Sequence, residues 1–188
     1  LIWPGFAHGS LDILIAKRIG LIKKKIDHII FFFVYIFLAI SFSVIWSLNS
    51  ELGFSFFLII SLIHFGMSDS NFLNKNIIYY LDVFVRGTIP LSIPVLMFEQ
   101  DVFRIFQTLF ITDDFIRLVL KLLKFNFYIL VSLLLFLFFK LKINKYNYFF
   151  EILALVFCFI YFEPLISFSI YFCFFHYLNH LFFEKKKL

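Results

Sequence analysis

The chain consists of long apolar stretches that are separated by short polar segments. A helix that crosses the hydrocarbon core of a bilayer needs about 20 mostly apolar residues. The pattern predicts about seven membrane segments, at residues 1–16, 29–48, 52–66, 77–97, 117–139, 148–162 and 165–183. The polar segment 98–115 predicts an additional helix at the membrane interface. We therefore expect an all-α protein, a polytopic transmembrane helical bundle that forms a single integral-membrane domain over residues 1–188.

The composition excludes the main alternatives to a membrane protein. Hydrophobic residues make up 63% of the 188 residues and charged residues only 15%, against about 25% charged residues in a typical soluble domain. A soluble globule could not cover this much apolar surface, and a disordered chain has far less of it. Two cysteines are too few for a disulfide scaffold. Because the first residue is Leu1 and not Met, we expect the sequence to be truncated at both ends.

The distribution of lysine and arginine predicts the orientation in the membrane. Alternating crossings place four regions on one side, and these hold 12 of the 17 basic residues; the regions are 17–25, 67–76, 140–147 and 184–188. By the positive-inside rule this side is cytoplasmic, in a multi-pass protein of the inner (plasma) membrane. Four basic residues fall near the opposite side and weaken the pattern: Arg104, Arg117, Lys121 and Lys124. The net charge of +5 reflects loop lysines, so we expect no nucleic-acid partner.

Four of the five histidines fall at a similar depth in the expected topology, toward the cytoplasmic half of the bilayer. They are His8, His64, His176 and His180, whereas His28 lies at the edge of a basic loop. The last two are spaced i, i+4, which places them on one face of a helix and suits two ligands on one ion. Imidazole suits Zn, Cu, Fe and Ni. The alternative is that each histidine hydrogen-bonds to a neighbouring helix.

Several acidic residues lie at the level of these histidines. Asp12 follows His8 by four residues, and Glu151 lies one turn into its helix. Either carboxylate could accept the second N–H of a ligating histidine and fix its tautomer. Asp69 could serve the same role or cap the loop that follows the helix. Asp82 and Arg86 are spaced i, i+4 and could pair inside the membrane.

Four motifs, in this order, resemble the Brp/Blh family of membrane-bound β-carotene 15,15′-dioxygenases. They are Pro-Gly-Phe-Ala-His-Gly-Ser-Leu-Asp at 4–12, His-Phe-Gly-Met-Ser-Asp at 64–69, Arg-Gly-Thr-Ile-Pro at 86–90, and Tyr-Phe-Cys-Phe-Phe-His-Tyr-Leu-Asn-His at 171–180. The chain departs from the family at Tyr177 and Asn179, where family members usually have Ser and Arg. Family members also extend beyond the last motif.

The resemblance implies a dioxygenase with an Fe(2+) centre held by His8, His64, His176 and His180. Its substrates would be β-carotene and O2, and cleavage at the central 15,15′ double bond would give two all-trans-retinal. The expected partners are therefore the lipid bilayer, in which the polyene dissolves, and a retinal-binding rhodopsin, to which the protein would be linked functionally. Residues of the motifs that could line a substrate cavity are Gly66, Arg86, Pro90 and Tyr171.

Other functions are compatible with the same residues. A non-catalytic membrane protein could bind a carotenoid or assist rhodopsin assembly without a metal. A proton-coupled transporter could use histidines and acids as a relay, although the sequence has no inverted repeat of the kind many transporters contain. Two histidines could also hold a haem.

Overall fold

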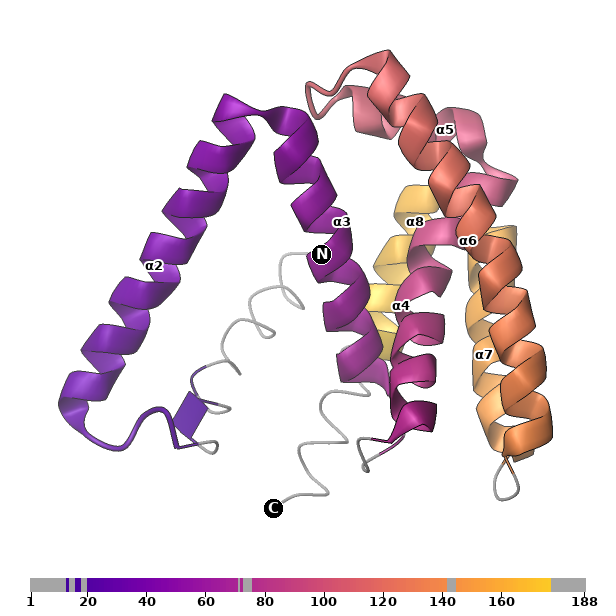
Figure 1. The fold of residues 1–188 in the computed structure, drawn as a ribbon, viewed down its shortest axis with the longest axis horizontal. Coiled ribbons are helices and arrows are strands. Elements are labelled where there is room, and N and C mark those ends of the chain that lie inside the picture. Colours follow the sequence, from indigo (N-terminus) through magenta and orange to yellow (C-terminus); the bar gives the residue numbers. More distant parts are fainter. Residues whose placement is uncertain are drawn as a thin grey trace. The chain divides into compact units, whose positions relative to one another are not determined.

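The protein is all-helical in a computed structural model that describes residues 13, 16–17, 20–70, 72, 76–141 and 145–176. These residues contain no strand, which confirms the expected all-α class. The helices shown in Figure 1 are α2 (Lys25–Leu48), α3 (Ser50–Asp69), α4 (Ile77–Met97), α5 (Glu99–Gln107), α6 (Asp113–Lys140), α7 (Lys145–Tyr161) and α8 (Pro164–Ile170). A π-helix, η1 (Tyr171–His176), continues directly from α8.

Four helices are long and apolar enough to cross a membrane: α2, α3, α4 and α6. Two shorter apolar helical stretches follow, at Tyr146–Tyr161 and Pro164–His176. The expected total of seven spans therefore stays a prediction. The short helix α5 confirms the additional helix expected within 98–115, and the rest of that segment includes the start of α6.

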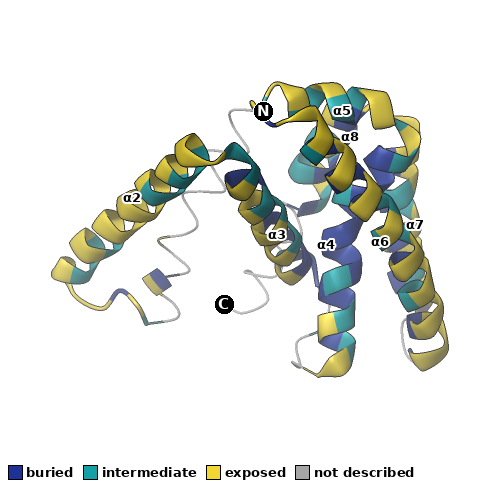
Figure 2. Ribbon diagram, turned by 45° about the horizontal axis from the view of Figure 1, so that its top comes forward, coloured by how far each residue is buried: buried dark blue, intermediate teal, exposed yellow. Residues whose placement is uncertain are grey.

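The chain divides into two compact units, Leu1–Ser55 and Phe56–Leu188. In the first unit, α2 has no buried residue, and Figure 2 shows it in the exposed and intermediate colours only. Near its end, Trp46 packs edge-on against Phe54, with ring centroids 6.3 Å apart. Gly53 makes this contact possible, because a Cβ there would lie 2.9 Å from the backbone of Trp46. An exposed apolar helix of this kind suits a lipid environment.

In the second unit, α4 is the most buried of the candidate spans and packs against α6 and α7 (Figure 2). Its residues Val85, Ile89 and Ile93 belong to a core that also contains Leu130 of α6 and Phe159 of α7. Asn76 caps the start of this helix, because its side chain accepts a hydrogen bond from the Tyr79 backbone N–H at 3.1 Å. The central position of α4 brings its polar side chains inside the unit.

Helices α3 and α4 approach each other at two glycines. A Cβ on Gly66 of α3 would overlap the carbonyl oxygen of Val83, and one on Gly87 of α4 would overlap that of Leu62. The two contacts are reciprocal, so each glycine admits the backbone of the other helix. Small residues at helix interfaces allow such close approach in membrane proteins. This contact brings the end of α3, and the acidic residue there, close to α4.

Candidate metal-binding site

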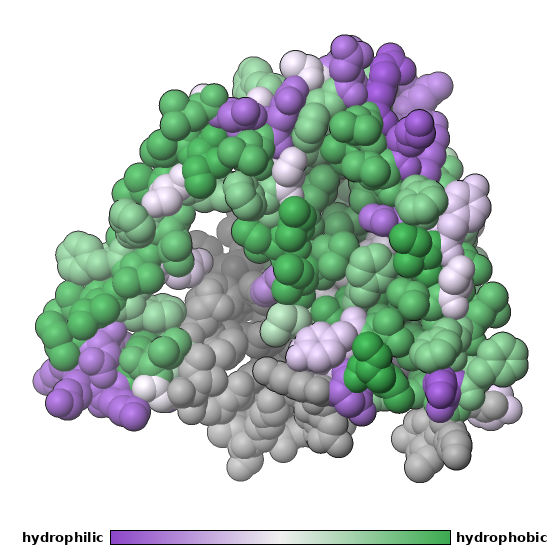
Figure 3. Space-filling view, in the orientation of Figure 1, coloured by the Kyte–Doolittle hydropathy of each residue, from purple (hydrophilic) through white to green (hydrophobic). Residues whose placement is uncertain are grey.

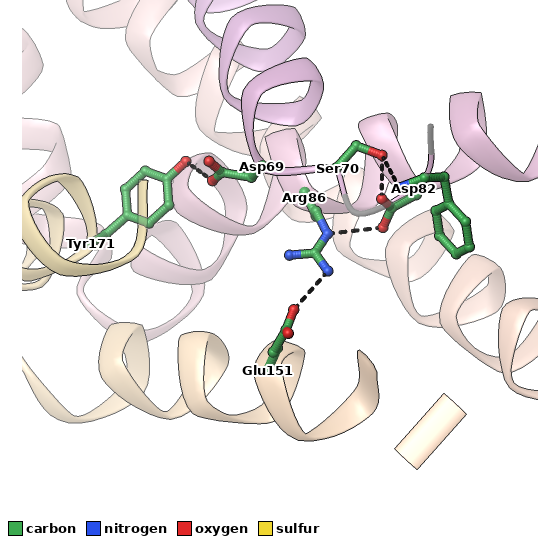
Figure 4. A network of polar contacts seen from close by, with 7 residues as sticks. Asp69, Ser70, Asp82, Arg86, Glu151 and Tyr171 are labelled. Carbon is green, nitrogen blue, oxygen red and sulfur yellow. Dashed lines mark hydrogen bonds and ion pairs between the residues drawn. The ribbon is translucent and has the colours of Figure 1, made fainter. Parts of the chain in front are cut away.

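Asp69, the last residue of α3, is the centre of a buried polar site. It is 3% exposed, and its two carboxylate oxygens accept hydrogen bonds from different side chains. The Tyr171 hydroxyl donates to Oδ2 at 2.7 Å, as Figure 4 shows, and His176 Nδ1 donates to Oδ1 at 2.8 Å. With Nδ1 donating to the carboxylate, a neutral imidazole has its lone pair on Nε2, the nitrogen that would bind a metal.

The π-helix explains how Tyr171 and His176 reach the same carboxylate. In an α-helix with 3.6 residues per turn, side chains five residues apart would point about 140° apart. A π-helix pairs residue i with residue i+5 and so brings these positions to one side. The sequence predicted a membrane segment over 165–183; in the part of it that the structure describes, the helix is α-helical up to Ile170 and π-helical from Tyr171 to His176, a change that the sequence did not predict. Short π-helical turns of this kind occur frequently at functional sites.

Aromatic rings surround the fully buried His176. The ring of Phe65 meets it edge-on at 5.1 Å between centroids, and Phe172 stacks on it at 5.6 Å. The Tyr171 ring lies at 5.8 Å. These groups keep water away from the imidazole and restrict its orientation, in addition to the hydrogen bond to Asp69.

His64 of α3 lies beside His176, with 5.4 Å between ring centroids and 59° between ring planes. A histidine nitrogen binds a metal ion at about 2.0–2.1 Å, so two imidazoles at this separation can share one ion. His64 is exposed, in contrast to His176. The donor set and the orienting carboxylate therefore fit a metal ligated by histidines.

The other two predicted ligands, His8 and His180, and the nearby Asp12 lie outside the described residues. Within the part of the chain that the structure describes, no group of three or more His, Cys, Asp or Glu side chains could hold a metal. The four-histidine set stays a prediction, of which His64 and His176 are placed side by side.

A second polar network lies on the other side of the α3 terminus (Figure 4). Arg86 Nε donates to Asp82 Oδ1 at 3.0 Å, and its Nη2 donates to Glu151 Oε2 of α7 at 3.1 Å. The Arg86 guanidinium also lies over the Tyr148 ring, 5.2 Å from the centroid. The expected pairing of Asp82 with Arg86 is thus confirmed. Both side chains are almost fully buried, whereas Glu151 is about half exposed.

Ser70 connects this network to the end of α3. Its hydroxyl donates to Asp82 Oδ2 at 2.7 Å and accepts from the backbone N–H of Phe72 at 3.3 Å. Ser70 directly follows Asp69 in the chain. Ser70 is bonded to α4 through Asp82, and Asp69 is bonded to η1 through Tyr171 and His176. The network therefore holds the segment that presents Asp69 to His176.

The structure assigns the polar residues more specifically than the sequence did. Asp69, for which a loop cap was the alternative, accepts from His176, and Glu151, suggested as an acceptor for a histidine, accepts from Arg86. Sequence reasoning missed Ser70 and Tyr148. Their only signal was that they are polar residues at the ends of apolar stretches, next to the other members of the network.

The four residues suggested for a substrate cavity have other contacts in the structure. Gly66 packs on the α4 backbone, Arg86 is in the ionic network, Tyr171 bonds to Asp69, and Pro90 is buried within the continuous helix α4. None of them lines the apolar groove of about 470 Å³ that is lined by side chains of α6 and α7 and by Ile93 of α4. Their role toward a substrate stays a prediction.

These features define an all-helical protein with membrane-length helices and a buried carboxylate–histidine site. A sequence model of the family described as "Beta-carotene 15,15'-dioxygenase" matches residues 1–186, and the chain belongs to this family. It is 29% identical over 190 residues to the beta-carotene 15,15'-dioxygenase of uncultured marine bacterium 66A03. That match covers 100% of this chain and 68% of the relative. No solved structure matches the chain.

Proposed function

We propose that the protein is an iron-dependent dioxygenase that cleaves β-carotene with O2 at its 15,15′ double bond. The observation that carries the proposal is the buried Asp69–His176 pair with His64 beside it, in a chain of this family. A carboxylate behind a histidine is the usual support of a metal ligand. The buried pair and its neighbour provide two of the four imidazoles that would hold Fe(2+), together with His8 and His180.

Asp69 has a positioning role in this proposal. It holds the proton of His176 on Nδ1 and so directs the lone pair on Nε2 toward the metal. Tyr171 donates to the other oxygen of Asp69 and limits rotation of the carboxylate. Bound Fe(2+) would supply the redox centre for the reaction of O2 with the polyene, in which each product aldehyde takes one oxygen atom.

The surrounding side chains exclude water and hold the histidine in place. Phe65 and Phe172 pack against His176, so the site is apolar apart from the groups that orient the ligands. β-Carotene dissolves in lipid and not in water, so a site within membrane helices can receive it from the bilayer. We place the protein in the inner membrane, with the site toward its cytoplasmic half.

The experiment is to express the protein in β-carotene-producing bacteria and measure retinal in extracts together with iron in the purified protein. We expect retinal and about one iron per chain, and loss of both in His64→Ala and His176→Ala. His28→Ala is the matched control, because His28 lies partly exposed in the first turn of α2 and should change neither. Absence of retinal with the wild-type protein present in membranes would contradict the proposal.

The apolar groove between α6 and α7 favours a second candidate function, non-catalytic binding of a carotenoid or assistance to rhodopsin assembly. The same experiment separates the two. A protein that co-purifies with intact β-carotene, without iron and without retinal, would support the second candidate.

A further inference from the structure

Four basic residues gather around one cavity at the α5 end of α6. The cavity has a volume of about 720 Å³, and its lining includes Arg104 of α5 and Arg117, Lys121 and Lys124 of α6. The three on α6 are spaced i, i+4 and i+7, which places them on one face of the helix. In Figure 3 hydrophilic side chains gather at this end of the unit, above the apolar flank of α6.

The positive charge of the cavity is only partly compensated. Glu99 is the one acidic residue in the lining, and its Oε1 lies 2.6 Å from Lys124 Nζ. Arg117 Cζ lies over the Phe103 ring, 5.2 Å from its centroid, and a guanidinium that contacts an aromatic ring through its face retains its N–H donors for other partners. Within the lining, four basic side chains therefore face one acidic side chain on a concave surface.

The cavity lies at the level expected for lipid headgroups. With 28 residues, α6 is about 42 Å long at 1.5 Å per residue, which exceeds the hydrocarbon core of about 30 Å. Residues 125–139 contain no charged side chain, so the apolar part of the helix begins directly after Lys124. Residues 125–139 span about 22 Å, less than the hydrocarbon core, so we expect Lys121 and Lys124 at the edge of the core, where their long side chains extend to the headgroup layer. Arg117 and the amphipathic helix α5 then stand in that layer.

We propose that this cavity binds the phosphate of an anionic phospholipid. Arginine offers a planar pair of N–H donors to phosphate oxygens, and lysine adds a mobile positive charge. Basic pockets at the membrane surface recognise anionic headgroups for this reason. The site also accounts for four basic residues that the positive-inside pattern left unexplained, and it does not depend on the proposed dioxygenase activity.

The test is a binding titration of the full chain in detergent with a fluorescent short-chain phosphatidylglycerol, using phosphatidylcholine and inorganic phosphate as competitors. We expect phosphatidylglycerol to bind about tenfold or more tightly than phosphatidylcholine. The double variant Arg117→Gln/Lys121→Gln should lose most of this difference, and Arg104→Gln on the other helix should lose part of it. High salt should weaken the binding.

The matched control is Lys24→Gln/Lys25→Gln, which removes the same charge at the exposed start of α2. It should bind phosphatidylglycerol as the wild type does. Equal binding of the two lipids, or an equal loss in the control, would overturn the proposal. Competition by inorganic phosphate as effective as that by the lipid would also overturn it, because the site would then recognise free phosphate.

Discussion

At the scale of single residues, Asp69 shares its two carboxylate oxygens between two donors. One accepts from His176 and the other from Tyr171, at 2.8 and 2.7 Å. The two donors come from a segment more than 100 residues away in the sequence, as the separations of 107 and 102 show. A single carboxylate thus fixes both the tautomer of a proposed ligand and the position of the helix that carries it.

The variant Asp69→Asn tests this role with almost no change in shape. An amide presents an NH2 group to one of the two donors, so one hydrogen bond is lost and the orientation of His176 is no longer fixed. We expect iron affinity and retinal formation to fall about 10–100-fold, measured by metal titration and product analysis. Asp27→Asn, in the exposed first turn of α2, is the control. Unchanged iron affinity in Asp69→Asn would contradict the role.

The ion pair of Arg86 and Asp82 leads to a prediction about stability. Arg86→Gln leaves the fully buried Asp82 without its opposite charge, which should lower the free energy of unfolding by about 3–5 kcal/mol. Lys124→Gln breaks the more exposed pair with Glu99 and should cost less than about 1 kcal/mol. Unfolding in a denaturing detergent compares the two. Equal losses would show that the buried network does not stabilise the unit.

At the scale of elements, the contact between α3 and α4 sets the geometry of the site. Gly66 is within one turn of both His64 and Asp69 on the same helix, so any displacement of α3 moves these side chains together. The reciprocal packing of Gly66 and Gly87 leaves no space for a side chain at either position.

Gly66→Ala should therefore push α3 away from α4. We expect a loss of about 1–3 kcal/mol in the free energy of unfolding, as for other overpacked interfaces, with a reduced retinal yield. Ser132→Ala, on the exposed face of α6, changes side-chain volume without touching a packed backbone and should have little effect. A Gly66→Ala protein as stable as the wild type would argue against the close contact.

The sequence could predict those helices and contacts that are determined by residues close together in the chain. The range 77–97 matches α4 because an apolar run is bounded by the capping residue Asn76 and the acidic start of α5. The i, i+4 spacing of Asp82 and Arg86 was sufficient to predict their pairing. The π-helix was missed, because a hydrophobic run of this density has no clear periodicity and the change in register depends on the contact with Asp69.

At the scale of the whole molecule, charged residues are few, 15% of the chain, and most of them lie between the apolar stretches. The apolar majority gives helices of membrane length, which the sequence predicted. The partners of Asp69, Ser70 and Glu151 could not be predicted, because each pairing joins segments far apart in the chain. Depth and spacing singled out the histidines, and Asp69 was one of three carboxylates suggested as an acceptor; the structure pairs it with His176.

The most direct test of the central claim is cleavage under 18O2. Purified protein loaded with Fe(2+) is given β-carotene and 18O2, and the products are reduced at once to alcohols so that the oxygen cannot exchange with water. The account predicts retinol as the product of symmetric cleavage, with one 18O atom in each molecule. Products of a different chain length, or retinol whose oxygen comes from water, would contradict it.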